Sequence, residues 1–474
     1  MNDYTRHEHH DFPGAVTQAL ADEPLQAALI RLTGTLMDGN RRGYAALADS
    51  DRLRDHAKHI KEHTLAHLDR YLEQLESSVT RLGGKVHWAA SAEDARTIIV
   101  DIARQANCKR AVKAKSMTSE EIHLNGALQK AGLEVTETDF GEFILQVAGE
   151  RPSHLVAPAV HHTRESVARV LSKHLEEDLP DDPRTLALTG RRILRQEFRQ
   201  ADLGITGANF AVAETGTIVL VTNEGNGRLT TTCPRVHVAI MGMEKVIPRL
   251  ADLPVFLKLL ARAATGQTLS VYTTLLTGPR RPNELDGPQE FHLVILDNGR
   301  SRILSGPFRE SLECIRCGAC LNACPVYRRI GGHAYGGVYS GPIGSILTPL
   351  YDSVSNNPEL PHASSLCGAC QAACPVKINI PRMLIGLREV QHHHRTSTGE
   401  HLAYKLWSLV LRKPWLYRLA LRFVRMLLGP LADDGWLKRL PGPGAGWTHA
   451  RDFPVPASRS FRDRWKELGK KDHG

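Results

Sequence analysis

The chain has 474 residues, more than one ordinary domain needs, and its hydrophobic fraction of 42% and charged fraction of 23% are typical of a soluble globular protein. No apolar run approaches the roughly 20 residues of a spanning helix, and the polar N-terminus lacks the apolar core of a secretory signal, so we expect a protein of the reducing cytoplasm. The formal charge of +9 indicates acidic partners without selecting among nucleic acid, anionic lipid and acidic protein.

Residues 1–55 are predicted to form a polar leader with short helices. From Ile60 to Leu82, leucines and Val79 recur three and four residues apart, which predicts a long helix that stops at Gly83 and Gly84. The repeat lasts barely three heptads, so we expect this helix to pack on its own domain rather than in a coiled coil between chains.

Between 85 and 300 the pattern alternates between strands and helices. Strands are predicted at 85–90, 110–115, 132–137 and 154–160, with helix caps at Ser91 and Thr118 and a helical insertion over 174–198. A hairpin is predicted around Glu214–Gly216, with further strands at 235–242, 268–276 and 291–299. The alternation predicts an α/β domain with a mainly parallel sheet over residues 56–300.

The composition changes near residue 300. The Gly- and Pro-rich interval 331–350 is predicted to be an ordered loop with little regular structure. The segment 391–474 is predicted to be a basic helical region, and in it Tyr404–Leu428 has six basic residues and no acidic one. Pro414 should split this segment into two helices.

The basic segment has three interpretations: a helix that docks a partner or packs on the chain itself, an interfacial helix on an anionic membrane, or a nucleic-acid surface. No nucleic-acid recognition motif is present, so no nucleic acid is expected. The histidines at 392–394 are interpreted as a polar helix face rather than a metal site.

Seven of the nine cysteines lie in two runs. The first, C-x2-C-x2-C-x3-C-P, and a shorter copy with three cysteines are typical of ferredoxin-type iron–sulfur proteins, in which the cysteine before proline ligates the other cluster. Structural zinc is the alternative, although zinc prefers closed tetrahedral knuckles. In this ligand swap, the last cysteine of each run ligates the cluster held by the other run. It assigns cluster 1 to Cys314, Cys317, Cys320 and Cys374, and cluster 2 to Cys324, Cys367 and Cys370.

The position that matches the missing cysteine is Ser364. Three arrangements stay open for cluster 2: an oxygen ligand from Ser364 or Ser365, a [3Fe-4S] cluster, or an iron site closed by water or a partner. We therefore expect two iron–sulfur clusters, most simply of the [4Fe-4S] type. The second is either a [4Fe-4S] cluster with a non-cysteine ligand or a [3Fe-4S] cluster. Cys108 and Cys233 stand alone and are interpreted as ordinary thiols.

Several long strings resemble the lactate-utilization B family of bacterial iron–sulfur proteins. These are Gly204–Pro248 (GITGANFAVAETGTIVLVTNEGNGRLTTTCPRVHVAIMGMEKVIP), Val112–Asn125 (VKAKSMTSEEIHLN) and the cysteine region with GGHAYGGVYSGPIGSILTPL and LCGACQAACPVKINIP. The resemblance covers roughly residues 55–430. It implies an N-terminal LUD domain with a fold like the ribose-phosphate isomerase and CoA-transferase sandwich, then a small helical dicluster ferredoxin-like domain (301–390). It also implies that the absent eighth cysteine is a family trait.

The resemblance implies a role in oxidising L-lactate to pyruvate, with electrons passing through two clusters to a partner or quinone. It implies two companions, a cysteine-rich A-type protein and a LUD-only C-type protein, and a cytoplasmic protein, either free or peripheral at the membrane through 404–428. The other reading is that the LUD domain itself binds and oxidises lactate. No nicotinamide or flavin fingerprint stands out, which favours the electron-transfer reading.

Basic and acid–base side chains near the predicted strand ends are candidates for a ligand site in the LUD domain. Lysine and arginine suit a carboxylate ligand, and a histidine or glutamate suits a general base. A turn with solvated surface charges is the alternative interpretation. The candidates are Lys113, Lys115, Glu214, Asn223, Arg228 and His292.

Overall fold

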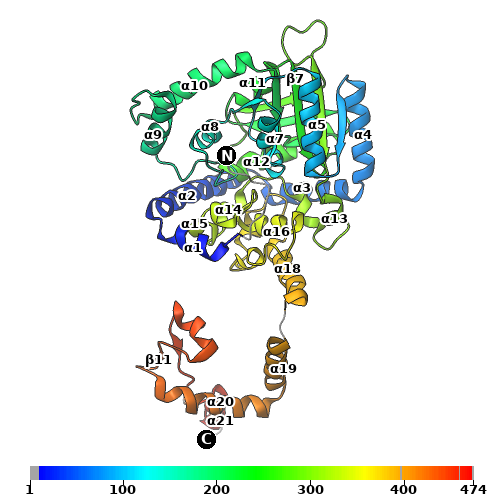
Figure 1. Ribbon diagram of the computed structural model, residues 1–474. Helices are drawn as coiled ribbons and strands as arrows, with labels where there is room; N and C mark the ends of the chain where they lie inside the picture. The colour runs from blue at the N-terminus through cyan, green and yellow to red at the C-terminus, as the bar shows by residue number, and fades with distance from the viewer. Residues whose placement is uncertain (1–9, 396–397, 458, 472–474) are drawn as a thin grey trace. The chain divides into compact units, whose positions relative to one another are not determined.

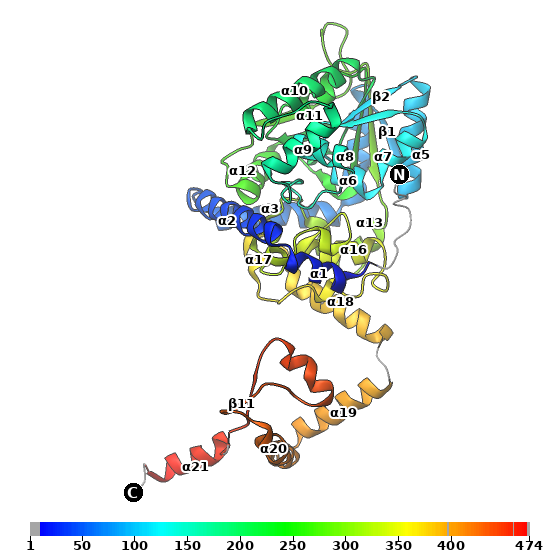
Figure 2. The same ribbon diagram turned by 60° about the vertical axis from the view of Figure 1, so that its left-hand side comes forward.

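The computed structural model describes residues 10–395, 398–457 and 459–471. The chain forms two compact units, one ending at Gln391 and the other beginning at His392. The first unit contains an α/β region (residues 68–300) and a cysteine region (residues 301–391), both seen in Figures 1 and 2. The second unit is mainly helical.

A six-stranded parallel sheet forms the centre of the α/β region (Figure 1). Its strand order is β1-β10-β7-β4-β2-β3, and every neighbouring pair is parallel. All seven residues of β7 are buried, as expected for a strand covered on both faces. The predicted parallel α/β fold is confirmed. The strands are β1 (Lys85–Ala89), β2 (Arg110–Lys113), β3 (Glu134–Glu137), β4 (Leu203–Thr206), β7 (Val236–Gly242) and β10 (Glu290–Leu296).

Helices connect and cover these strands. A capping box starts α5, because Ser91 accepts a hydrogen bond from the Asp94 N–H and the Asp94 carboxylate accepts one from the Ser91 N–H. The predicted cap at Thr118 is wrong, since Ser116 caps that helix. The helices are α4 (Leu68–Arg81), α5 (Ala92–Gln105), α6 (Met117–Glu121), α7 (Leu124–Lys130), α8 (Phe140–Ala148), α9 (Arg164–Leu175), α10 (Pro183–Gln200), α11 (Asn226–Thr232) and α12 (Leu253–Thr265).

A second, four-stranded sheet has the order β8-β5-β6-β9. Its strands are β5 (Phe210–Val212), β6 (Thr217–Thr222), β8 (Val246–Ile247) and β9 (Tyr272–Leu276). β5 and β6 form the predicted antiparallel hairpin. Gly216 in its turn has φ 67°, and a Cβ there would lie 2.8 Å from the backbone of Ser78 and Val79, so the turn requires glycine.

The predicted single helix over 60–82 is wrong. Two helices, α3 (Ser50–Ala66) and α4, meet at His67, whose φ of −129° and ψ of 37° interrupt the helical hydrogen bonding. The apolar side of α4, including Leu72 and Leu75, packs against the buried strand residues Met241 and Leu293. The expectation that the repeat packs within its own domain is therefore correct.

The predicted strand over 154–160 is also wrong. These residues belong to an irregular loop between α8 and α9, here called the 149–163 loop. Within it the N–H groups of Val156 and Ala157 donate to His154 Nδ1 at 3.0 and 3.1 Å. Leu155 packs in the core shared with the cysteine region. Local hydrogen bonds thus replace those of a neighbouring strand.

The cysteine region consists of short helices. They are α13 (Arg300–Leu304), α14 (Ala319–Ala323), α15 (Tyr327–Ile330), α16 (Gly341–Tyr351), α17 (Ala369–Ala373) and α18 (Ile380–Arg395). α16 corrects the prediction of little regular structure over 331–350, and Pro342 in its first turn costs no helical hydrogen bond. Short 3-10 turns occur at Met243–Lys245, Leu250–Asp252, Arg309–Glu313, His333–Tyr335 and Leu360–His362.

The N-terminal segment is not a set of short helices, because α1 (Phe12–Ala21) is followed by the 23-residue α2 (Glu23–Ala45). The N-terminal end of α2 lies beside the cysteine region, and its C-terminal end beside α12 (Figure 1). Leu29 is fully buried there. A Cβ on Gly266 would lie 2.3 Å from the backbone of Gly39, so two glycines allow this close helix contact.

The second unit contains α19 (Thr398–Arg412), α20 (Pro414–Leu428), β11 (Trp436–Leu437), β12 (Phe453–Pro454) and α21 (Phe461–Lys471), with 3-10 turns at Gly429–Leu431 and Gly442–His449. Pro414 separates α19 from α20 as predicted. Among the described residues, no helix has both the length and the apolar character needed to cross a membrane.

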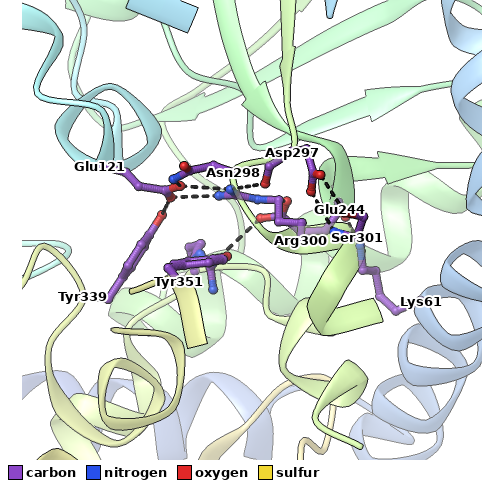
Figure 3. Close-up of polar contacts among 10 residues, drawn as sticks. Lys61, Glu121, Glu244, Asp297, Asn298, Arg300, Ser301, Tyr339 and Tyr351 are labelled. Carbon is purple, nitrogen blue, oxygen red and sulfur yellow. Dashed lines mark hydrogen bonds and ion pairs between the residues drawn. The ribbon is translucent and has the colours of Figure 1, made fainter. Parts of the chain in front are cut away.

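A buried ionic network joins the α/β region to the cysteine region (Figure 3). Arg300, directly after β10, donates from Nε to Glu244 Oε2 at 2.7 Å and from Nη2 to Glu121 Oε2 at 2.8 Å. The Arg300 and Glu244 side chains are 0% and 2% exposed. Charges this deeply buried are tolerated only when they are paired and hydrogen-bonded.

The cysteine region completes the same network. Arg316 donates to Glu244 Oε1 at 3.4 Å and to the Tyr351 hydroxyl at 3.1 Å, and its guanidinium lies 4.7 Å from the Tyr339 ring centroid. The Tyr339 hydroxyl donates to Glu121 at 2.6 Å (Figure 3). Burial alone would raise the pKa of Glu244, yet the two guanidinium groups hold it at about 2. Glu244 is therefore ionised and shared by both regions.

Replacing Glu244 with glutamine is expected to destabilise the protein by about 3–5 kcal/mol, because two buried guanidinium groups lose their shared counterion. The matched control is Glu290→Gln, which breaks the 2.7 Å pair with Lys85 at a site where the side chains are 42% and 59% exposed. That change should cost at most about 1 kcal/mol. The urea midpoint of anaerobic protein, followed by far-UV circular dichroism, measures both. Equal shifts in the two variants would contradict the structural role of Glu244.

Candidate iron–sulfur centre

The two cysteine runs are conformational copies of each other. Gly318 and Gly368 both adopt positive φ, 77° and 80°, and each starts a five-residue helix, α14 or α17. Two residues before each glycine, Arg316 and Leu366 also have positive φ, 59° and 55°. Both helices end at a cysteine in extended conformation, followed by proline. The backbone thus repeats even though the second run has one cysteine fewer, and Ser364 occupies the position of Cys314.

The four thiols that the sequence assigns to cluster 1 surround one hollow. Its wall comprises the cysteines at 314, 317, 320 and 374 together with apolar side chains, among them Leu155, Ile343 and Val376. The N–H groups of Arg316 and Ile378 point at the sulfurs of Cys314 and Cys374, both at 3.4 Å. Sulfurs from both runs, small neighbouring residues and backbone donors fit a cubane cluster.

Three of the four cysteines of this hollow, Cys317, Cys320 and Cys374, are buried, and Cys314 is half-buried. Burial raises the pKa of Cys320 well above the ordinary thiol value and also raises that of Cys374, to about 12. As free thiols these groups would stay protonated at neutral pH, whereas metal ligation requires thiolates. Iron therefore has to supply the positive charge that makes the site stable, and metal binding becomes coupled to folding.

The three thiols assigned to cluster 2 form a more open group. Cys324 and Cys370 are buried, whereas Cys367 is exposed. The N–H of Tyr327 donates to the Cys324 sulfur at 3.5 Å. The Ala369 N–H and the Ser365 hydroxyl lower the pKa of Cys367. The second site therefore lies near the protein surface, with a thiol already favoured as thiolate.

The two serines near cluster 2 have different contacts. Ser364 Oγ accepts a hydrogen bond from the Leu366 N–H at 3.1 Å, so its side chain closes its own turn. The Ser365 side chain instead points to Cys367. Of the two, Ser365 has the contact with a ligand-type sulfur, and the fourth ligand of the second cluster stays a prediction.

Positive charge surrounds cluster 1 on its α/β side. Arg316 lies between Cys314 and Cys317 and belongs to the ionic network. Lys61 and Lys245 are buried nearby, and burial lowers the pKa of each to about 8. These cations offset the negative charge that four ligating thiolates bring to the interior. The sequence pattern does not predict this network, and its one local signal is the arginine between two cysteines.

Lys113 is not free to bind an anionic ligand. It is fully buried at the carboxyl end of β2, with Nζ 2.6 Å from Glu120 and 2.8 Å from Glu137. Glu142 lies in the same group, and burial together with Glu137 raises its pKa well above the ordinary value. Lys115 follows on the same edge, half-buried, close enough to Glu142 to lower its pKa.

The other four candidate residues lie elsewhere. His292 is stacked on His87 near the amino end of β10, opposite the edge of Lys113, and burial lowers its pKa to about 4. Glu214 accepts from the Leu250 N–H in the second sheet's turn. The Asn223 side chain donates a hydrogen bond to Gln267 Oε1 and accepts one from the Val271 N–H. Arg228 is exposed on α11. His292 therefore lies apart from Lys113 and Lys115, and the role of the six residues in ligand binding stays a prediction.

The two lone cysteines have no ligand-type arrangement. Cys108 is buried, and burial raises its pKa to about 11. Cys233 is exposed at the end of α11, and its pKa is also raised by burial of the thiol. Neither belongs to the two cysteine runs.

Comparison with known families divides the chain in the same order as the structure. Residues 72–296 match the LUD domain, residues 310–378 the 4Fe-4S dicluster domain, and residues 387–470 the C-terminal domain of lactate utilisation protein B. The match of the dicluster domain identifies the cysteine region as an iron–sulfur domain, as the spacing predicted. A DUF162 family protein from Deinococcus radiodurans aligns over 48% of this chain and 98% of its own, at 14% identity and a TM-score of 0.28.

Curated relatives match almost from end to end. Lactate utilization protein B of Bacillus velezensis is 44% identical over 97% of both chains, and that of Bacillus subtilis is 44% identical over 95% of both. The protein of the same name from a Geobacillus species is 48% identical over 86% of both chains. The matched domains and the extent of this identity show that the chain belongs to the lactate utilization protein B family.

Proposed function

We propose that this protein is an electron-carrying iron–sulfur subunit of an assembly that oxidises L-lactate to pyruvate. The main support for this proposal is the hollow lined by cysteines of both runs. Beside it lies a second cysteine group that reaches the surface. When bound, iron–sulfur clusters supply one-electron transfer. The names of the relatives support lactate utilization as the setting.

The chain's own residues suit this role by giving the two sites different environments. Leu155, Ile343 and Val376 exclude water from the first site, and Arg316 places a positive charge beside it. Cys367 leaves the second site accessible from outside. A buried site with stabilised charge and an exposed site next to it fit a carrier that meets its redox partner at the surface.

The alternative, in which the LUD domain itself oxidises lactate, has less support. Lys113, the most buried basic candidate, is already paired with two glutamates, and Lys115 lies beside the acidic group. A carboxylate ligand would therefore meet a Lys113 ammonium group whose charge is already neutralised. We therefore propose that electrons come from companion proteins, the cysteine-rich A-type and the LUD-only C-type, and leave to a partner or quinone.

We further propose that the segment Tyr404–Leu428 contacts an anionic membrane surface. On α20, Arg418 and Arg422 are exposed without an acidic residue in the segment. The same helix exposes Trp415, Phe423 and Leu427 at 59%, 52% and 64%. Arginines with exposed aromatic and aliphatic side chains are typical of interfacial helices.

The ligand swap predicts how single cysteine substitutions should group. Cys374→Ala should change the electron paramagnetic resonance spectrum of the reduced protein in the same way as Cys320→Ala. Cys324→Ala should match Cys370→Ala. Without a swap, Cys374→Ala would instead match Cys370→Ala. Cys233→Ala is the control and should keep the wild-type spectrum and iron content, about eight irons for two complete cubanes or about seven with a three-iron cluster.

A carrier should not be reduced by lactate alone. L-lactate added to the isolated, oxidised protein without oxygen should leave the visible absorbance of the clusters unchanged, because Lys113, the buried candidate for binding the substrate carboxylate, is already paired with Glu120 and Glu137. Dithionite is the positive control and should bleach the same sample. Adding the A-type and C-type companions should then allow bleaching by L-lactate. Bleaching by L-lactate without companions would favour the catalytic alternative.

Membrane contact should depend on the arginines of α20. The protein should cosediment with anionic vesicles and less so as salt rises, since screening weakens surface charge interactions. Arg418→Glu/Arg422→Glu should abolish this binding. Arg191→Glu/Arg195→Glu is the matched control, a pair of exposed arginines one turn apart on α10, and should bind as wild type. Equal sedimentation of all three proteins would overturn the membrane proposal.

A further inference from the structure

The 149–163 loop connects the α/β region to the iron–sulfur centre. The Tyr327 hydroxyl donates to the Ser153 carbonyl at 2.8 Å, and His154 Nε2 lies 3.0 Å from Asn322 Oδ1 in a buried contact. Directly after these two residues, the loop inserts Leu155 into the wall of the cluster 1 hollow. Whatever fixes the two ends of this loop therefore also fixes part of that wall.

Three side chains with metal-ligating atoms converge at the base of the loop. His161 Nε2 and His162 Nε2 lie 2.7 and 2.9 Å from the same oxygen, Oε2 of Glu150. The ligand atoms of all three residues lie within 4.8 Å of one another. The two histidines are 15% and 9% exposed and Glu150 is 42% exposed. One side of the group is thus enclosed and the other is open to solvent.

Hydrogen bonding fixes which nitrogen of His162 carries the proton. The Ser166 hydroxyl donates its hydrogen to the Thr163 carbonyl at 2.8 Å. It must therefore accept at its 2.9 Å contact with His162 Nδ1, which makes Nδ1 the donor. In the neutral ring, Nε2 then presents a lone pair to the carboxylate oxygen of Glu150. Two lone pairs at 2.9 Å repel unless a cation or an additional proton lies between them.

A second proton on each ring would not suit this group. The two rings have centroids 4.6 Å apart, so two imidazolium ions would repel each other. His161 Nδ1 is buried without a hydrogen-bond partner among the described residues, so its proton has no acceptor either in a charged ring or in a ring that ligates an ion through Nε2. The His333 ring packs 4.7 Å from His161 and donates from Nε2 to the Arg151 carbonyl, but it makes no hydrogen bond to His161 Nδ1.

We propose that Glu150, His161 and His162 bind one divalent ion of the zinc class. Two imidazole nitrogens and one carboxylate oxygen are a ligand set that zinc accepts, with the fourth position left to water on the exposed side of Glu150. The Ser166 hydroxyl orients the His162 ring for ligation. This site is separate from the two cysteine groups and does not depend on the proposed function in lactate oxidation.

The ion would close the ends of the 149–163 loop. Glu150 begins the loop and the two histidines end it, so a shared ion ties both ends together and restricts the ten residues between them. Ser153, His154 and Leu155, which touch the cysteine region, lie inside that closed segment. The role assigned to the ion is therefore structural, as a clamp on the loop that covers cluster 1.

Zinc binding by the anaerobic, iron-loaded protein tests this proposal. After a chelator wash, the protein should take up one equivalent of Zn²⁺ in competition with a chromophoric chelator. His162→Ala and Glu150→Gln should abolish this uptake, and Ser166→Ala should weaken affinity by about 10–100-fold. The matched control is His63→Ala/His67→Ala, a second histidine pair with ring centroids 4.8 Å apart, which should bind as wild type.

X-ray absorption at the zinc edge locates the bound ion. The site predicts nitrogen and oxygen neighbours at about 2.0–2.1 Å, whereas zinc misplaced in the cysteine groups would show sulfur at about 2.3 Å. Sulfur neighbours, or equal zinc uptake by wild type and the His162→Ala variant, would overturn the proposal. Iron content and cluster spectra, measured on the same samples, report separately on the electron-transfer function.

Discussion

The structure depends on one buried carboxylate, Glu244, which two guanidinium groups share. Arg300 begins α13, four positions after the end of β10, and Arg316 comes from the loop between two cysteines. Removing three charges from water is costly, and the cost is offset only when all three are in place together. The α/β region and the cysteine region therefore have one strongly favoured arrangement, and this arrangement sets the position of Arg316, whose N–H points at the Cys314 sulfur.

The two cysteine groups differ in exposure, and the group next to this ionic network is the less exposed of the two. The first is enclosed by apolar side chains and backed by cations, while the second ends in the exposed Cys367. The copy that lacks a cysteine contains the exposed Cys367, and its residues Leu366 and Gly368 keep the positive φ that Arg316 and Gly318 have in the first copy. The local fold thus does not need the eighth thiol. A weaker or open ligand position is tolerated best where solvent or a partner can complete it.

Sequence patterns predicted what depends on neighbours along the chain. Strand–helix alternation, the hairpin at Glu214–Gly216 and the iron–sulfur domain all follow from local period or spacing. The strand predicted at 154–160 failed because its apolar residues pack against the cysteine region instead of a sheet. The Arg300–Glu244–Arg316 network could not be predicted from the sequence, because the two arginines lie 56 and 72 positions after Glu244. In addition, nothing in the sequence indicates that a charged residue is buried.

The failure of the six ligand candidates to converge has a physical reason with a functional consequence. Open parallel α/β sheets bind ligands at the carboxyl ends of their strands. Here that edge is occupied: Lys113 is neutralised by Glu120 and Glu137, and Arg300, after β10, uses its hydrogen bonds to join the cysteine region. The edge that could hold a small substrate instead holds the iron–sulfur domain. The α/β region thereby holds the cysteine region in a fixed position at this edge of the sheet.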